Sequence, residues 1–372
     1  MSLCVIHRLS TMNWNTTERV VAAAVAIYAF IIYTLTVAPT ASFWDAGEFI
    51  AISHGLQVSH PPGAPFYMLV GRLFSMFVPV AYISLAVNMV SVVASALTIL
   101  LTHLIIVRLA RTALGADDDI TSAQRLMTLI GGVVGSTTFA VTDSFWFNAV
   151  EAEVYALSMF FTAIVVWLAL RWSELARLEE ANAVGGTKPF GLEANRYLLL
   201  IAYLFGLAIG VHLLNLLAIF FVGLIFFFQE YERPTWTNAA RVKGIIVAGL
   251  VSAGSFLLVY PIIIQKLPDW ADKSGAPVLF MLGVVALVVG AVYFTHQRRL
   301  AVGNLLSLSI LLVLIGYSSY AVIFIRSNAN PPIDENDPEN TEAIVSYLKR
   351  EQYGDTPIIK GNSYNNRLGR ID

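Results

Sequence analysis

Long apolar runs dominate this sequence and constrain its fold more than any other feature. A bilayer-crossing helix needs about 20 mostly apolar residues, and charged residues make up only 13% of the chain, against roughly 25% in a soluble domain. Because backbone inside lipid must satisfy its own hydrogen bonds, the sequence predicts an all-α polytopic membrane protein with about nine transmembrane helices. The candidate runs are 20–38, 84–107, 126–142, 154–170, 197–211, 213–228, 244–264, 277–295 and 300–325.

The basic residues predict how these helices are oriented. With the N-terminus inside, the short outer loops hold only Arg72, Lys266 and Lys273. Most other Lys and Arg residues fall on the inner side, which is a strong positive-inside bias. This sorting requires two short helices around His212 rather than one long broken helix, because a single helix would reverse every later segment.

Three regions follow from this orientation. We expect a cytoplasmic N-terminus at 1–19 and a transmembrane domain at 20–325 that includes an outer loop at 39–83. A charged extracytoplasmic tail at 326–372 should contain one helix, starting at Asp337-Pro338 and ending near Glu351.

The remaining composition excludes several classes of protein. The net charge of −2 gives no reason to expect nucleic-acid binding. The single cysteine, Cys4, excludes an intramolecular disulfide and a cysteine-rich metal site.

The first outer loop carries a pair of carboxylates. If residues 44–56 are helical, Asp45 and Glu48 lie three residues apart on one face. Two such carboxylates repel each other unless a cation or hydrogen-bond donor relieves them, and the pair suits a general base with an orienting partner. The plainer alternative is an acidic first turn that the helix dipole favours.

The same loop supplies further candidate ligands. His54 and His60 can donate hydrogen bonds to a phosphate or a sugar hydroxyl, and His60 opens a rigid Pro-Pro-Gly turn. Arg72 lies on an expected surface helix at 64–80, where membrane anchoring is the alternative. The spacing of these histidines and carboxylates matches no tight metal motif.

The later outer segments also carry candidate substrate-binding residues. We expect Glu151, Glu153 and Tyr155 to bind substrate, with Glu151 and Tyr155 on one helical face; an ordinary wet helix end is the alternative. His212 and Asn215 are polar groups in an apolar stretch, and such groups mark either a site or a helix break.

One arginine completes the candidate site. Arg326 ends the last apolar run. It could reach to the interface as an anchor or bind a lipid phosphate, for which the forked guanidinium is suited.

Two segments resemble a known family. Residues 40–48 (TASFWDAGE), followed by His60-Pro61-Pro62-Gly63, resemble the first loop of the protein O-mannosyltransferase-like membrane family. The tail segments 326–336 and 350–355 are similar to its bacterial branch. The resemblance covers nearly the whole chain.

The resemblance implies a GT-C superfamily glycosyltransferase. Such an enzyme would move a sugar, here mannose, from a polyprenyl-phosphate carrier to a protein Ser or Thr hydroxyl with inversion. By this likeness Asp45 is the catalytic base, and Glu48 positions the acceptor or the base. A divalent cation, Mg²⁺ or Mn²⁺, is the one cofactor left open.

The resemblance also implies a location and a longer protein. The chain is expected in the bacterial inner membrane, with its active face periplasmic. Family members usually continue into more spans or a soluble domain, so the chain, which stops at Asp372, is expected to be an N-terminal fragment.

Two other classes of protein stay open. A transporter or flippase of lipid-linked sugars would also need acids and an arginine near one membrane face, although transporters usually place polar groups near the midplane. A structural membrane scaffold would not need the cluster of Asp45, Glu48 and His60 at all.

Overall fold

The computed structural model describes residues 13–115, 120–182, 193–233 and 235–354, and within them it is helical without a named strand. This confirms the all-α prediction. The longer helices are α2 (Trp14–Thr36), α5 (Ile83–Leu114), α6 (Ser122–Ala140), α8 (Val154–Asn182), α9 (Asn195–Ile209), α10 (Ala218–Tyr231), α11 (Asn238–Leu257), α13 (Pro277–Gln297) and α14 (Ala301–Tyr317).

All nine predicted runs fall on helices, but fewer than nine meet the length of a full span. Among the described residues, seven helical segments are long and apolar enough to cross a membrane, or eight if the bent pair of α6 and α7 (Asp143–Ala149) counts as one. Helix α9 has 15 residues, so at about 1.5 Å per residue it is shorter than the ~30 Å hydrocarbon layer. The expected break at His212 is present, because the 3₁₀ turn η4 (Leu213–Leu217) separates α9 from α10.

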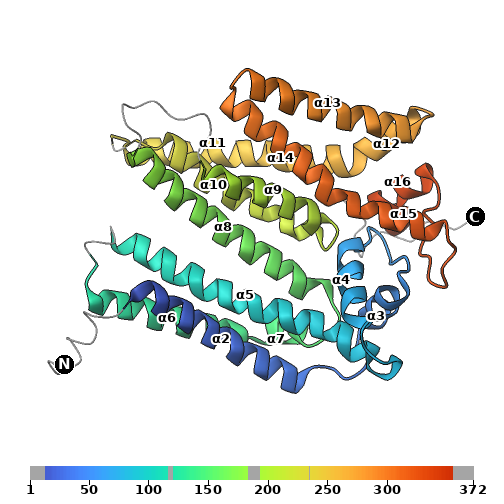
Figure 1. Ribbon diagram of the computed structural model, residues 1–372, viewed down its shortest axis with the longest axis horizontal. Coiled ribbons are helices and arrows are strands. Elements are labelled where there is room, and N and C mark those ends of the chain that lie inside the picture. Colours follow the sequence, from blue (N-terminus) through green and yellow to red (C-terminus); the bar gives the residue numbers. More distant parts are fainter. Residues whose placement is uncertain (1–12, 116–119, 183–192, 234, 355–372) are drawn as a thin grey trace, which may run out of the picture.

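The long helices run side by side in a bundle (Figure 1). Helix α5 packs against α2, α6 and α8, and α8 continues the contacts to α9 and α10. Helix α14 packs on α9, and α13 lies at the edge against α14 without a buried residue of its own. An apolar surface as exposed as that of α13 suits contact with lipid.

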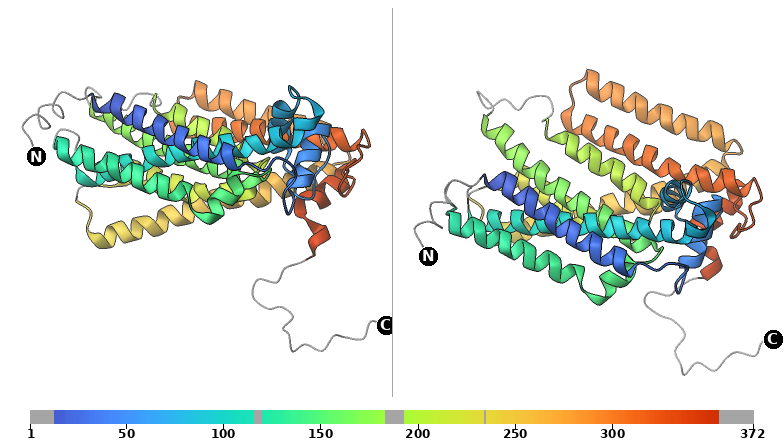
Figure 2. Two further views of the ribbon diagram at one scale, coloured as in Figure 1. Left: turned by 90° about the horizontal axis from the view of Figure 1, so that it is seen from below. Right: turned by 60° about the horizontal axis from the view of Figure 1, so that its bottom comes forward.

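The short helices gather at one end of the bundle (Figures 1 and 2). They are α3 (Ala46–Gly55), α4 (Pro65–Ser75), the π-helix η5 (Leu258–Lys266), α12 (Leu267–Lys273), α15 (Ala321–Ser327) and α16 (Thr341–Lys349). The expected helices at 44–56 and 64–80 therefore exist as the shorter α3 and α4. The tail helix begins later than Asp337, because the side chain of Asn340 caps α16 by accepting from the Ala343 amide at 2.9 Å.

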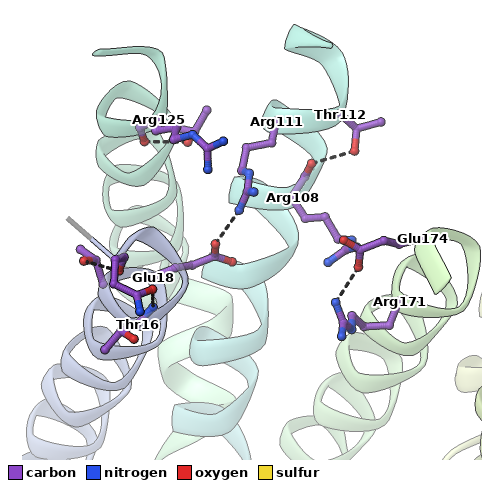
Figure 3. Close-up of polar contacts among 11 residues, drawn as sticks. Thr16, Glu18, Arg108, Arg111, Thr112, Arg125, Arg171 and Glu174 are labelled. Carbon is purple, nitrogen blue, oxygen red and sulfur yellow. Dashed lines mark hydrogen bonds and ion pairs between the residues drawn. The ribbon is translucent and has the colours of Figure 1, made fainter. Parts of the chain in front are cut away.

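Basic residues join the helices at the opposite end (Figure 3). Arg111 of α5 pairs with Glu18 of α2 at 3.0 Å. Glu174 of α8 pairs with both Arg108 and Arg171. These contacts tie α2, α5 and α8 together at the end that the charge bias assigns to the cytoplasm; that assignment stays a prediction.

A close approach between α9 and α14 predicts a position that is sensitive to substitution. A Cβ added at Gly316 of α14 would lie 2.6 Å from the backbone of Gly206 in α9, so the helices would have to separate. We expect Gly316→Ala to destabilise the protein by about 1–3 kcal/mol, the usual effect of overpacking.

Thermal unfolding of the purified protein measures this effect. Gly290→Ala on α13 is the matched control, because a Cβ there meets nothing within 4 Å. Its melting temperature should stay at or slightly above wild type, since alanine favours helix. Equal melting temperatures for the two variants would contradict the packing argument.

Candidate active site

Asp45 lies directly before α3 and points a carboxylate at open space. It occupies the N-cap position, but its side chain makes no capping hydrogen bond. The structure also gives this exposed carboxylate no hydrogen bond to any other described residue. Its neighbour Trp44 has a left-handed backbone with φ of 59°, which turns the chain sharply into the helix. Asp45 is therefore an acid held in place by backbone and left open to a ligand.

Glu48, in the first turn of α3, contacts His60. Its Oε1 accepts from the His60 amide at 2.7 Å, and its Oε2 lies 2.9 Å from His60 Nδ1. Burial alone raises the pKa of Glu48, but the hydrogen bonds and charge of His60 outweigh it, and the net pKa is lowered. The hydrogen bond to Glu48 likewise raises the pKa of His60 above its ordinary value. This contact fixes the Pro-Pro-Gly turn against α3.

Glu151 and Glu153 precede α8 rather than belonging to it. The helix begins at Val154, so the expected helical face shared by Glu151 and Tyr155 does not form. Glu151 Oε2 accepts from Ser42 Oγ at 2.5 Å. Glu153 is only 5% exposed, and burial, together with the charges of Asp45 and Glu151, raises its pKa to about 7.

His212 and Asn215 shape the break between α9 and α10. His212 Nδ1 accepts from the Leu214 amide at 3.3 Å, and its ring lies 5.1 Å from that of Tyr155. Asn215 is buried, and its Oδ1 accepts from Ser158 and from Thr162. Asn215 therefore serves the helix break, whereas His212 keeps one ring edge toward a cavity.

A cavity of about 760 Å³ collects the candidate residues. Six of the eleven that the sequence singles out line it, and they come from three separate parts of the chain. These six are Asp45, Glu48, His60, Glu153, Tyr155 and His212.

The other five lie outside the lining. Arg72 Nη1 donates to the His54 carbonyl at 2.5 Å and lies 3.2 Å from its Nδ1, so these two bind each other. Arg326 Nε donates to the Leu56 carbonyl at 2.5 Å and closes the C-terminal end of α3. Glu151 and Asn215 have the partners given above. Ligand contacts for these residues stay predictions without support from the cavity.

The sequence reasoning missed the contribution of the tail. Arg350 and Tyr353 line the cavity, because Tyr347 of α16 donates to the Ser59 carbonyl at 2.6 Å and holds the tail over the first loop. The one available signal was the likeness of residues 350–355 to the bacterial branch. No periodicity or spacing connects positions almost 300 residues apart.

A divalent cation fits these residues poorly. Asp45, Glu48 and His60 each offer one ligand atom within 4.8 Å of the others. However, both Glu48 oxygens already interact with His60, and the raised pKa of His60 favours its cationic form, which repels a metal ion. We assign no step to Mg²⁺ or Mn²⁺.

The Glu48–His60 contact predicts a pH dependence. The raised pKa of His60 means that stabilisation is complete below about pH 6.5 and is lost as pH rises through the folded value. The lowered pKa of Glu48 means that it is also lost as pH falls below about 4.3. The melting temperature of Glu48→Gln should fall furthest below wild type between these limits, and a gap that does not vary with pH would argue against the ion pair.

The raised pKa of Glu153 predicts that protein stability falls steadily as pH rises above the ordinary pKa of a glutamate. Its folded pKa of about 7 exceeds the ordinary value of about 4.3, so the folded state holds the proton longer and stability falls as pH rises between the two. The melting temperature of wild type, compared with that of Glu153→Gln at the same pH, should decline as pH rises from about 5 to about 8. Glu342→Gln, at an exposed site on α16, is the control and should follow wild type.

Comparisons with known proteins identify the family. The model of the protein O-mannosyl-transferase TMEM260 N-terminal domain matches residues 45–235, slightly more than half of the chain. Protein O-mannosyl-transferase TMEM260 of Mus musculus is 24% identical over 169 residues, covering 45% of this chain and 22% of the relative.

A second relative extends the likeness. Protein O-mannosyl-transferase tmem260 of Dictyostelium discoideum is 25% identical over 252 residues, covering 66% of this chain and 28% of the relative. The chain thus spans about a quarter of the length of these relatives, and no solved structure matches it. The resemblance seen in the first loop is confirmed: the chain belongs to the family of the protein O-mannosyl-transferase TMEM260 N-terminal domain.

Proposed function

We propose that this chain carries the catalytic cavity of a membrane glycosyltransferase that moves mannose to a protein Ser or Thr hydroxyl. The relatives are named as protein O-mannosyl-transferases, and the matched region begins at Asp45 itself. The single observation that carries the proposal is a cavity walled by Asp45, Glu48 and Glu153 at one end of a membrane bundle.

Asp45 is proposed as the general base. A base needs a lone pair within reach of the acceptor proton, and Asp45 is the cavity carboxylate without a hydrogen-bond partner among the described residues. Glu48 is occupied by His60, and the side chain of Glu153 is buried, so it is less accessible to an acceptor hydroxyl than Asp45. A partly protonated Glu153 also limits the repulsion that a second full charge would exert on Asp45.

The reaction we propose is one displacement with inversion. Asp45 takes the proton of the acceptor hydroxyl as its oxygen bonds to the anomeric carbon of the sugar. The bond from that carbon to the phosphate oxygen breaks, and the polyprenyl phosphate leaves with the electron pair. Glu48 acts as a positioning residue, because its contact with His60 fixes the loop opposite Asp45.

The proposed setting is a GT-C architecture in a bacterial inner membrane. Residues 20–325 would form the membrane domain and 326–372 the outer tail, with the N-terminus inside and the cavity periplasmic. The ion pairs of Arg108, Arg111 and Arg171 at the end opposite the cavity support this orientation, since basic residues favour the cytoplasmic side.

The position of the acids favours an enzyme over a transporter of lipid-linked sugars. Transporters bind substrate near the midplane of the membrane. Here the carboxylates line a cavity beside α3 and the start of α8, and Figure 1 shows α3 at the end of the bundle.

Asp45→Asn tests the proposal. The change keeps the size of the side chain but removes its basicity, so transfer of labelled mannose from polyprenyl phosphate to a Ser/Thr peptide should fall by about 10²-fold or more. Glu48→Gln should reduce transfer less, because it acts through His60. The matched control is Asp143→Asn, an exposed acid on α7 outside the cavity.

Two results would overturn the proposal. Near-normal transfer by Asp45→Asn would remove Asp45 as the base. No transfer by the wild-type chain, in membranes where the protein is folded, would remove the assigned activity.

A further inference from the structure

The cavity has two chemically different walls. One wall is apolar and comes from Leu213, Leu214 and Leu217 of η4, Phe256 of α11 and Tyr260 of η5. Leu214 and Leu217 are more than half exposed. Both segments belong to candidate membrane spans, Leu213–Tyr231 and Asn238–Lys273. This wall is therefore an apolar surface built from candidate membrane spans.

The other wall is polar and comes from segments outside the candidate spans. It holds Asp45, Glu48, His60 and Glu153, with His212 at the junction between the two walls. Arg350 is the only lysine or arginine among the described residues that line the cavity. A cavity with acids, a cation and an apolar wall suits an amphipathic ligand with a charged group at its middle.

The fold holds Arg350 in place through its backbone. It is the C-cap of α16 and has a left-handed conformation with φ of 61°. Tyr347 binds the first loop, and Lys349 lies 3.6 Å from Asp269 of α12. These neighbours anchor the helix end, so the arginine is presented from a fixed position.

The guanidinium itself has room for an anion. Arg350 makes no ion pair with any described residue, and its one aromatic contact places Cζ 4.8 Å from the Tyr353 ring centre. Arg350 lines the same cavity as His60 and His212, and burial, together with the charge of Arg350, lowers the pKa of His212. Arg72 and Arg326, in contrast, donate to backbone carbonyls.

We propose that Arg350 binds the phosphate of the polyprenyl-phosphate donor, whose chain lies along the Leu214–Leu217 wall and whose sugar points toward Asp45. This assignment rests on the proposed function, because it takes the lipid-phosphate donor from it. A planar guanidinium can bind two phosphate oxygens at once. His212 stands at the junction of the walls, where its ring can donate a second hydrogen bond.

The position also suits the chemistry. The phosphate is the leaving group, and it gains negative charge as the bond to the sugar breaks. A fixed cation beside it stabilises the transition state more than the ground state.

Binding measurements separate the phosphate from the lipid. The purified chain in nanodiscs would be titrated with a long-chain polyprenyl monophosphate and with the matching polyprenol, which lacks the phosphate. Wild type should bind the phosphate form more tightly. Arg350→Gln should lose about tenfold or more of that affinity, as expected for a charge-assisted contact, and keep its affinity for polyprenol. The affinity of Arg350→Lys for the phosphate form should lie between those of wild type and Arg350→Gln, because lysine keeps the charge but cannot donate two parallel hydrogen bonds.

Two further variants sharpen the readout. Leu217→Ala should weaken binding of both lipids by a similar factor, because it removes apolar wall and no charge. Lys273→Gln is the matched control, since it removes an exposed cation at the same end of the molecule but outside the cavity lining, and it should bind both lipids as wild type does. Melting temperatures equal to wild type would show that the Arg350 variants are folded.

Competition distinguishes the source of the phosphate. Inorganic phosphate or phosphatidylglycerol at the same concentration should not displace polyprenyl phosphate, and displacement by either would overturn the lipid-donor assignment. An Arg350→Gln variant that keeps the wild-type preference for the phosphate form would overturn the role of Arg350 alone. A wild-type chain with no such preference would overturn the donor class, and the proposed function with it.

Discussion

Backbone hydrogen bonding inside lipid is the constraint on which this structure depends. Peptide groups within the apolar runs cannot bond to water, so each run forms a helix that satisfies them internally. Polar backbone and charged side chains are then confined to the ends of the bundle. Figure 1 shows the consequence, because the short helices α3, α4 and α16 gather at one end. The candidate site lies there because irregular chain is tolerated there.

Within that end, three acids share one cavity and have three different environments. Glu48 is relieved by His60 at 2.9 Å, and burial raises the pKa of Glu153 to about 7. Asp45 is exposed and has no hydrogen-bond partner in the described chain. Like charges so close together cannot all stay ionised at no cost. His60 occupies Glu48 and burial encloses Glu153, so Asp45 is the carboxylate of the three that is exposed and without a hydrogen-bond partner in the described chain.

The tail completes the cavity from a distance in sequence. Tyr347 binds the carbonyl of Ser59, and a parallel bridge joins Val58 to Asp334. Arg326 closes the end of α3 through the Leu56 carbonyl. Arg326 thus has a structural role, whereas Arg350 is presented to the cavity. Arg326 lies beside the backbone carbonyls at the end of α3, whereas Arg350 lies beside the open cavity.

The sequence by itself determined the helical class, the position of each apolar run and the closeness of Asp45 to Glu48, because these depend on hydrophobicity and on spacing of a few residues. It also suggested His60 through the first-loop motif. Only the tertiary structure decided that Glu151 lies outside the helix of Tyr155, that His54 and Arg72 bind each other, and that Arg350 rather than Arg326 lines the cavity. Contacts between positions almost 300 residues apart leave no local pattern, since they arise from how the helices pack.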